Sequence, residues 1–123
     1  MQSSLKSEFS RVWPLLKPAL TVHGDTHRKR HVWEALEARK VQLWSSPNAA
    51  IVTEIKVFPT GYKHVNGWLT GGNLDEILQL VPQIEAWAKK LGANSIGVDM
   101  ARPGWARKLP GYSTVSVNVL KDL

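Results

Sequence analysis

Apolar residues in the first third of the chain recur at helical spacing. One stripe, with positions three or four residues apart, consists of Leu5, Phe9, Val12 or Trp13, Leu16 and Leu20. We expect Pro14 and Pro18 to break or bend this helix, because each removes a backbone donor. A second apolar stripe predicts a helix from the N-cap residue Asp25 to about Arg39. The chain is therefore expected to begin with two amphipathic helices.

The period of the pattern then changes from that of a helix to that of a strand. Short runs rich in β-branched and aromatic residues predict strands over 41–44, 50–58 and 63–69. Turn-forming residues separate them, namely Asn48 and the sequence Pro59-Thr60-Gly61. This pattern indicates a three-stranded antiparallel meander.

A helix over 73–91 is the strongest feature of the pattern. It follows the pair Gly71-Gly72, with Asn73 as its N-cap and Glu76 completing an arrangement like a capping box. Pro82 is expected to kink it. The residues expected to pack on one face of the meander are Ile77, Val81 and Ile84.

The last quarter of the chain predicts a buried strand over 95–100, a short helix or turn over 102–109, and a final strand over 114–120. A length of 123 residues is typical of one domain. The sequence thus predicts a single α/β domain over 1–123, with a mixed central sheet and flanking helices.

Six short motifs carry a resemblance to a known family. In chain order they are WEALEAR at 33–39 with VQLW at 41–44, VTEI at 52–55, GGNLDE at 71–76, IEAWA at 84–88, RPGW at 102–105 and LPGY at 109–112. Together they are similar to small GNAT-like proteins that tailed phages and prophages encode, GNAT being the acetyl-CoA-dependent N-acetyltransferases. The resemblance spans residues 30–112 and implies a GNAT-like fold, in a protein of the bacterial cytoplasm or of the virion.

The resemblance also implies where a cofactor would bind. GNAT enzymes hold the pyrophosphate of acetyl-CoA in an R/Q-x-x-G-x-G/A loop before the central helix. The segment that matches this loop is Leu69-Thr70-Gly71-Gly72-Asn73. Its glycines can form a nest of N–H groups, or the segment can serve only to cap the helix.

Two features of this segment weaken the match to the GNAT loop. No Arg or Gln precedes the glycines, and the carboxylates of Asp75 and Glu76 in the first helical turn would repel a pyrophosphate. We therefore expect acetyl-CoA binding to be weak or absent. Arg102 and Trp105, which follow a predicted buried strand, are further candidates to line a ligand cleft.

Two residues are candidates for a catalytic base. Glu54 lies on the second predicted strand, where it faces either a cleft or solvent, and His64 lies on the third, with an ordinary pKa near 6.5. The resemblance places the acid Tyr of GNAT enzymes at about Trp105 or Ala106, and neither donates a proton. Tyr112 corresponds to an aromatic residue that is usually packed. Catalysis is therefore expected to be weak or lost.

The charge of the chain adds one further possibility. It carries 16 Lys and Arg against 10 Asp and Glu, for a net charge of +6, with a basic cluster at 27–31. Such a cluster suits nucleic acid or another anionic partner, or it is a solvated helix face. His27 and His31 are four residues apart, but the cations between them would repel a metal ion, so we expect no metal site. The chain contains no Cys, and we expect neither an export signal nor a membrane-spanning segment.

Two main hypotheses for the function follow. In the first, the chain is a phage-type GNAT-fold protein, weak or inactive in catalysis, that interacts with a virion component or an unknown protein partner. In the alternative, it is an acetyl-CoA-dependent N-acetyltransferase with an unknown amine acceptor. A nucleic-acid-binding role through the basic cluster is the least favoured.

Overall fold

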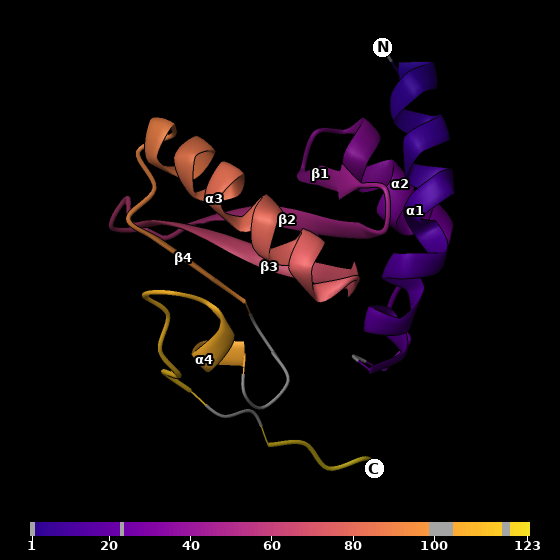
Figure 1. Cartoon of the computed structure of the whole chain (residues 1–123). Helices are drawn as coiled ribbons and strands as arrows, with labels where there is room; N and C mark the ends of the chain where they lie inside the picture. The colour runs from indigo at the N-terminus through magenta and orange to yellow at the C-terminus, as the bar shows by residue number, and fades with distance from the viewer. Residues whose placement is uncertain (1, 23, 99–104, 117–118) are drawn as a thin grey trace.

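The chain folds around one four-stranded sheet with helices on both faces. The computed structural model describes residues 2–22, 24–98, 105–116 and 119–123, and Figure 1 traces the order of its elements. These elements are α1 (Gln2–Val22), α2 (Lys29–Glu37), β1 (Val41–Ser46), β2 (Ala49–Val57), β3 (Lys63–Gly72), α3 (Leu74–Lys90), β4 (Ser95–Val98) and α4 (Trp105–Lys108).

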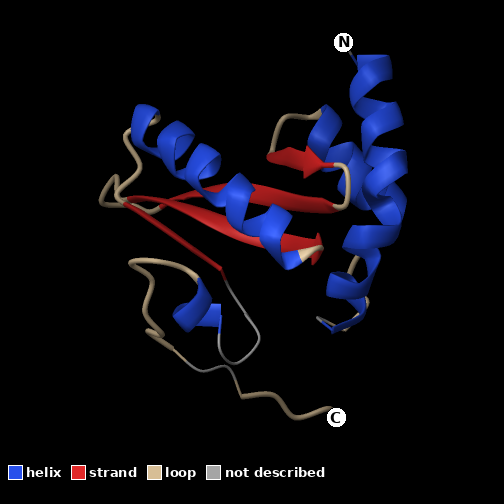
Figure 2. Cartoon of the chain, in the orientation of Figure 1, coloured by secondary structure: helices blue, strands red, loops and turns tan. Residues whose placement is uncertain are grey.

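The sheet has the strand order β1-β2-β3-β4. Its first three strands form the expected antiparallel meander, and β4 pairs with β3 in parallel, so the sheet is mixed as predicted. Alternate residues of a strand face opposite sides of a sheet. Ala50 and Val52 accordingly pack against α1 and α2, whereas Ala49 and Ile51 pack against α3. Figure 2 shows these helices on the two sides of the strands.

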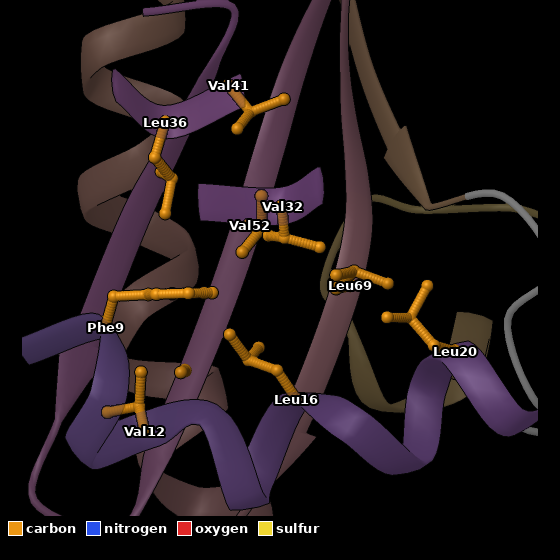
Figure 3. Close-up of a cluster of buried hydrophobic side chains, with 10 residues drawn as sticks. Phe9, Val12, Leu16, Leu20, Val32, Leu36, Val41, Val52 and Leu69 are labelled. Carbon is orange, nitrogen blue, oxygen red and sulfur yellow. The ribbon is translucent and has the colours of Figure 1, made fainter. Parts of the chain in front are cut away.

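The first core lies between the sheet and the two N-terminal helices. The predicted stripe of α1 is confirmed, since Phe9, Val12, Leu16 and Leu20 are buried and point toward β2 and β3 (Figure 3). The expected break at Pro14 and Pro18 does not occur, and α1 runs past both. Both prolines are exposed, so the carbonyl groups that lose a helical donor there can be hydrated.

The second helix begins later than expected. Its N-cap is Arg28, whose backbone N–H donates to Nδ1 of His31 at 2.9 Å, so the prediction of Asp25 as N-cap is wrong. Asp25 has φ 53°, and its N–H donates to the carbonyl of Leu20 at 2.8 Å. This residue therefore ends α1 in a left-handed conformation and does not start α2.

The central helix α3 packs as predicted on the other face of the sheet. Asn73 is its N-cap and accepts a hydrogen bond from the N–H of Glu76. Ile77 and Ile84 are buried, and Val81 is half-buried against the same core. Pro82 lies on the exposed side of the helix, which continues past it to Lys90.

The end of the chain differs from the prediction. No residue of 114–116 or 119–123 belongs to a strand, and Val115 and Val119 are 90% and 93% exposed. Within the described residues no strand pairs with the outer edge of β4, so Val115 and Val119 lack both a ladder and an apolar cover. The expected buried strand over 95–100 is confirmed for the half-buried Ser95–Val98, and Asp99, Met100 and Arg102 lie outside the described residues.

In the described ranges, no helix combines the length and the apolarity needed to cross a membrane.

One close approach in this fold gives a testable prediction. A Cβ atom on Gly71 would overlap the backbone carbonyl oxygen of Leu15 in α1, whereas one on Gly67 would lie in ordinary contact, 3.4 Å from Cγ2 of Val98. We expect Gly71→Ala to lower the free energy of unfolding by about 3 kcal/mol or more, at the upper end of overpacking costs. Gly67→Ala on the same strand should cost far less. Chemical denaturation measures both, and equal losses would contradict the close approach.

Candidate functional site

A cleft lies on one face of the sheet, between α3 and the C-terminal part of the chain. Strands β2, β3 and β4 form its floor, α3 forms one wall, and α4 with the turn after it forms the other. The cleft contains about 390 Å³ of empty space, part of it open to solvent. Gly67 and Gly97 lie in the floor. The lack of a side chain on Gly67 leaves room above β3, whereas a Cβ on Gly97 would point to the opposite face, 3.2 Å from Cε1 of His64.

The lining of this cleft is almost entirely apolar. Its main apolar side chains are those of Ile51, Ile77, Val81, Ile84, Ile96, Val98, Trp105 and Leu109. Of its hydroxyl groups, that of Thr53 is buried and already bonded: it accepts from Nε1 of Trp44 at 3.1 Å and donates to Oε1 of Gln42 at 2.8 Å. The cleft thus suits an apolar group more than a charged one.

Tyr112 closes one end of the cleft. Its hydroxyl donates to Oε2 of Glu85 on α3 at 2.9 Å. Burial, together with the hydrogen bond to Glu85, raises the pKa of Tyr112. The residue therefore stays protonated at neutral pH and fastens the turn after α4 to α3, which is the packing role that the LPGY motif predicts.

The segment expected to hold a cofactor phosphate is instead part of the sheet. Gly71 and Gly72 are the last residues of β3 and pair with Ala50 and Ala49 of β2. Leu69 is buried in the first core. Within this segment only Thr70 lines the cleft, so the glycines form no phosphate-binding loop.

Groups of the protein itself occupy the start of α3. The N–H of Asn73 donates to the carbonyl of Asn48 at 2.8 Å, and the side chain of Asn73 accepts from the N–H of Glu76 at 3.1 Å. Oε1 of Glu76 in turn accepts from Oγ of Ser46 at 2.7 Å and from the N–H of Asn48 at 2.8 Å. These bonds hold the turn between β1 and β2 against the helix end and lower the pKa of Glu76.

A second set of bonds fastens the same turn to α1. Arg11 donates to the carbonyl oxygens of Pro47 and Ser46, each at 2.9 Å, and to both carboxylate oxygens of Glu8 at 2.8 Å. Oγ of Ser45 donates to Glu8 at 2.6 Å. The hydrogen bonds from Arg11 and Ser45 lower the pKa of Glu8 to about 2. We call the residues Glu8, Arg11, Ser45, Ser46, Asn48 and Glu76 the turn network.

Both candidate bases lie on the face of the sheet away from the cleft. Oε1 of Glu54 accepts from Nδ2 of Asn66 at 2.9 Å and lies 3.8 Å from Nζ of Lys56. Nδ1 of His64 lies 2.7 Å from Oγ of Ser95. Neither Glu54 nor His64 lines the cleft: the residues of β2 that face it are Ile51 and Thr53, and those of β3 are Gly67 and Thr70.

Trp105 is placed at the cleft, where it also packs against the second core. Arg102 lies outside the described residues. Sequence reasoning missed the bond between Tyr112 and Glu85 and the turn network. Contacts such as that from Arg11 to Pro47 join residues 36 positions apart and leave no local pattern.

This fold defines a class of protein. In the GNAT-like fold an antiparallel meander is followed by a central helix. The next strand pairs in parallel with the last strand of the meander, which makes the sheet mixed. A solved structure with the same architecture is the ribosomal-protein-alanine N-acetyltransferase of Brucella melitensis biovar Abortus 2308, with a TM-score of 0.58 and 12% sequence identity over 95% of this chain and 91% of that one. No protein-family model and no curated protein matches the chain. The chain therefore has an N-acetyltransferase-like fold.

The start of α3 is where this fold would hold the phosphates of its implied cofactor, acetyl-CoA. A pyrophosphate needs free N–H groups at the start of α3. Here the N–H groups of Asn73 and Glu76 are bonded within the protein, and the carboxylates of Asp75 and Glu76 lie in the first turn. These residues do not fit the phosphates of acetyl-CoA.

The turn network predicts how stability depends on pH. The pKa of Glu8 falls on folding from 4.5 to about 2, so its contribution is present above pH 4.5 and is lost as the pH falls toward 2. We expect Glu8→Gln to destabilise the protein near neutral pH, with the difference from wild type shrinking toward pH 2. Ser45→Ala, which removes one of the three hydrogen bonds to the Glu8 carboxylate, should behave in between. Denaturation at a series of pH values measures this, and parallel curves for all three proteins would contradict it.

Proposed function

We propose that this chain is a phage-type GNAT-fold protein that does not transfer acetyl groups and acts by binding another protein. That partner is a virion component or a host protein, and the chain works in the bacterial cytoplasm or in the virion. One observation carries the proposal: the start of α3, where the fold would hold a cofactor, is occupied by the protein's own hydrogen bonds.

This closure is difficult to reverse. A Cβ on Gly71 would overlap the backbone of α1, and one on Gly72 would overlap the carbonyl of Asn48, so both glycines lie against neighbouring backbone. Room for a phosphate there requires α1 or the turn between β1 and β2 to move. A carboxylate near a helix end interacts with the dipole by about 0.3–1 kcal/mol. Asp75 and Glu76 interact favourably with the helix dipole and would repel a bound pyrophosphate. This repulsion thus lowers the affinity for the pyrophosphate by roughly a factor of ten.

The catalytic groups support the same proposal. Glu54 and His64 are engaged with Asn66 and Ser95 on the face away from the cleft. At the position that matches the acid Tyr of GNAT enzymes the chain has Trp105 or Ala106, and neither side chain protonates a thiolate. Within the described residues, the ionisable side chain that lines the cleft is that of Tyr112, and its hydroxyl is already bonded to Glu85.

A second candidate function is acetyl-CoA-dependent transfer to an unknown amine. The apolar cleft between α3 and α4 favours it, because an apolar part of a ligand suits its lining and Gly67 carries no side chain there. This candidate requires the phosphates to be held elsewhere than at the start of α3.

Calorimetric titration of the purified chain with acetyl-CoA separates the two functions. We expect binding to be undetectable or weaker than about 1 mM, equivalent to roughly −4 kcal/mol, because the N–H groups of Asn73 and Glu76 are already used and two carboxylates lie in the first turn. An active GNAT acetyltransferase in the same buffer is the positive control. A wild-type dissociation constant in the low micromolar range, or acetyl transfer to a generic amine above the buffer rate, would establish the second function instead.

A pair of variants tests the reason for weak binding. Asp75→Asn combined with Glu76→Gln removes both carboxylates, and we expect it to strengthen any residual acetyl-CoA binding by about tenfold. Glu34→Gln with Glu37→Gln, on the distant helix α2, removes the same charge and should leave binding unchanged. Equal effects of the two pairs would mean that net charge, and not the helix start, governs binding.

A further inference from the structure

The hairpin between β2 and β3 exposes apolar side chains at its tip. Val57, Phe58 and Tyr62 are 63%, 47% and 45% exposed. They lie within six residues of one another at the end of the sheet opposite the junction with α3 (Figure 1). Single exposed apolar residues are ordinary, but an adjacent group of them is typical of an interaction site. We call these three residues the hairpin tip.

The hairpin tip is held in one conformation. The N–H of Phe58 donates to the carbonyl of Tyr62 at 2.9 Å, and the N–H of Gly61 donates to the carbonyl of Phe58 at 2.8 Å. Gly61 has φ 86°, which a glycine adopts without strain. The rings of Phe58 and Tyr62 pack against each other, with centroids 6.2 Å apart. A partner would therefore lose little conformational entropy on the side of this protein.

Three lysines lie at the same end of the molecule as the hairpin tip. Lys63 donates from Nζ to the carbonyl of Leu91 at 2.9 Å, and the N–H of Asn94 donates to the carbonyl of Lys63 at 2.7 Å. These bonds bring the end of α3, with the exposed Lys89 and Lys90, to the same end of the molecule. We call Lys63, Lys89 and Lys90 the lysine rim.

The sequences at this end carry no negative charge. Residues 55–72 and 86–98 contain no Asp or Glu. Of the described carboxylates, that of Glu54 lies 3.8 Å from Nζ of Lys56. The potential around the hairpin tip is therefore positive, and it complements an acidic partner.

We infer that the hairpin tip and the lysine rim form the docking surface for an acidic protein segment with apolar side chains. Protein interfaces combine a rigid aromatic centre, which contributes most of the affinity, with a charged rim that guides association. The aromatic pair and the lysines have this arrangement. The inference rests on the proposed partner-binding function and names the surface that performs it.

The observations favour a protein partner over a lipid surface or a nucleic acid. The two rings are only half-exposed, and so small an apolar area gives marginal membrane binding. The ring planes are inclined by 53° and contact each other, so they do not offer parallel open faces on which successive bases stack.

Selection from a displayed library of random short peptides on the immobilised full chain tests the inference. We expect enriched peptides in which Asp or Glu flank Leu, Ile, Phe or Trp. A synthetic copy of an enriched peptide should bind about tenfold or more weakly to Phe58→Ser with Tyr62→Ser, as for hot-spot residues. Its affinity should also fall with added salt and with Lys89→Gln and Lys90→Gln.

Matched variants control for general effects. Val22→Ser removes an apolar residue that is 58% exposed at the end of α1, and Arg28→Gln with Lys29→Gln removes two cations from α2. Neither should weaken the peptide, and circular dichroism should show every variant folded. The inference is overturned if no acidic peptide is enriched, or if the enriched peptides bind the Phe58 and Tyr62 variant as well as wild type.

Two other binding assays can also overturn the inference. Binding to phosphatidylglycerol vesicles, or to oligothymidine, that depends on Phe58 and Tyr62 while no peptide is enriched would assign the surface to lipid or to nucleic acid. The proposed function fails separately, because acetyl-CoA titration does not involve the hairpin tip. Tight acetyl-CoA binding would leave the peptide result standing, and a failed selection would leave the titration unaffected.

Discussion

The contact between the backbone of Leu15 in α1 and Gly71 in β3 is the constraint on which the rest of this structure depends. Since no side chain fits there, α1 approaches the end of the sheet closely enough for Arg11 to reach the turn between β1 and β2. That turn then lies on Gly72 and Asn73. As a result β3 stays paired up to its last residue, and a single residue, Asn73, connects it to α3.

A direct connection of this kind changes what the start of α3 does. In the GNAT fold the positive end of the central helix is the natural place for an anionic ligand. Here Glu76 supplies the negative charge from within the chain, and Asn73 supplies a further acceptor. The electrostatic preference of the helix end is thus satisfied by intramolecular bonds, which contribute to the stability of the fold.

The parts of the fold that could be predicted are those that local chemistry determines. The meander follows from β-branched runs and turn residues, and the start of α3 follows from its N-cap Asn73, so both predictions are confirmed. Glu76 does not complete the expected capping box, because its carboxylate accepts from Ser46 and Asn48 and not from the N–H of Asn73. The prediction of Asp25 as N-cap is wrong because the carbonyl of Leu20 engages this residue in the preceding helix end. The prediction of a final strand is wrong for the described residues 114–116 and 119–123, because alternating apolar residues alone supply no neighbouring strand to pair with.

The site was harder to predict because it depends on which face of the sheet each residue occupies. The register shifts between Val52 and Thr53, and a one-residue shift exchanges the two faces. The extra residue lies in β3, so the shift places His64 on the face away from the cleft. Glu54 lies on that face by plain alternation with Thr53, although both strands were assigned correctly. The sequence identifies the glycines of the segment expected to hold the cofactor. Whether these glycines bind phosphate or allow a helix to pack closely depends on α1, some 55 residues earlier in the chain.

The retained cleft follows from packing alone. Trp105, Leu109 and Tyr112 cover the side of α3 that carries Ile77 and Ile84, and Gly67 leaves space beneath them. This space lies between elements that the fold itself brings together, and a fold does not by itself imply a function. The cleft therefore reflects the fold, whereas the junction at Gly71 and the charge of the exposed hairpin reflect this particular sequence, and arguments about its function belong to them.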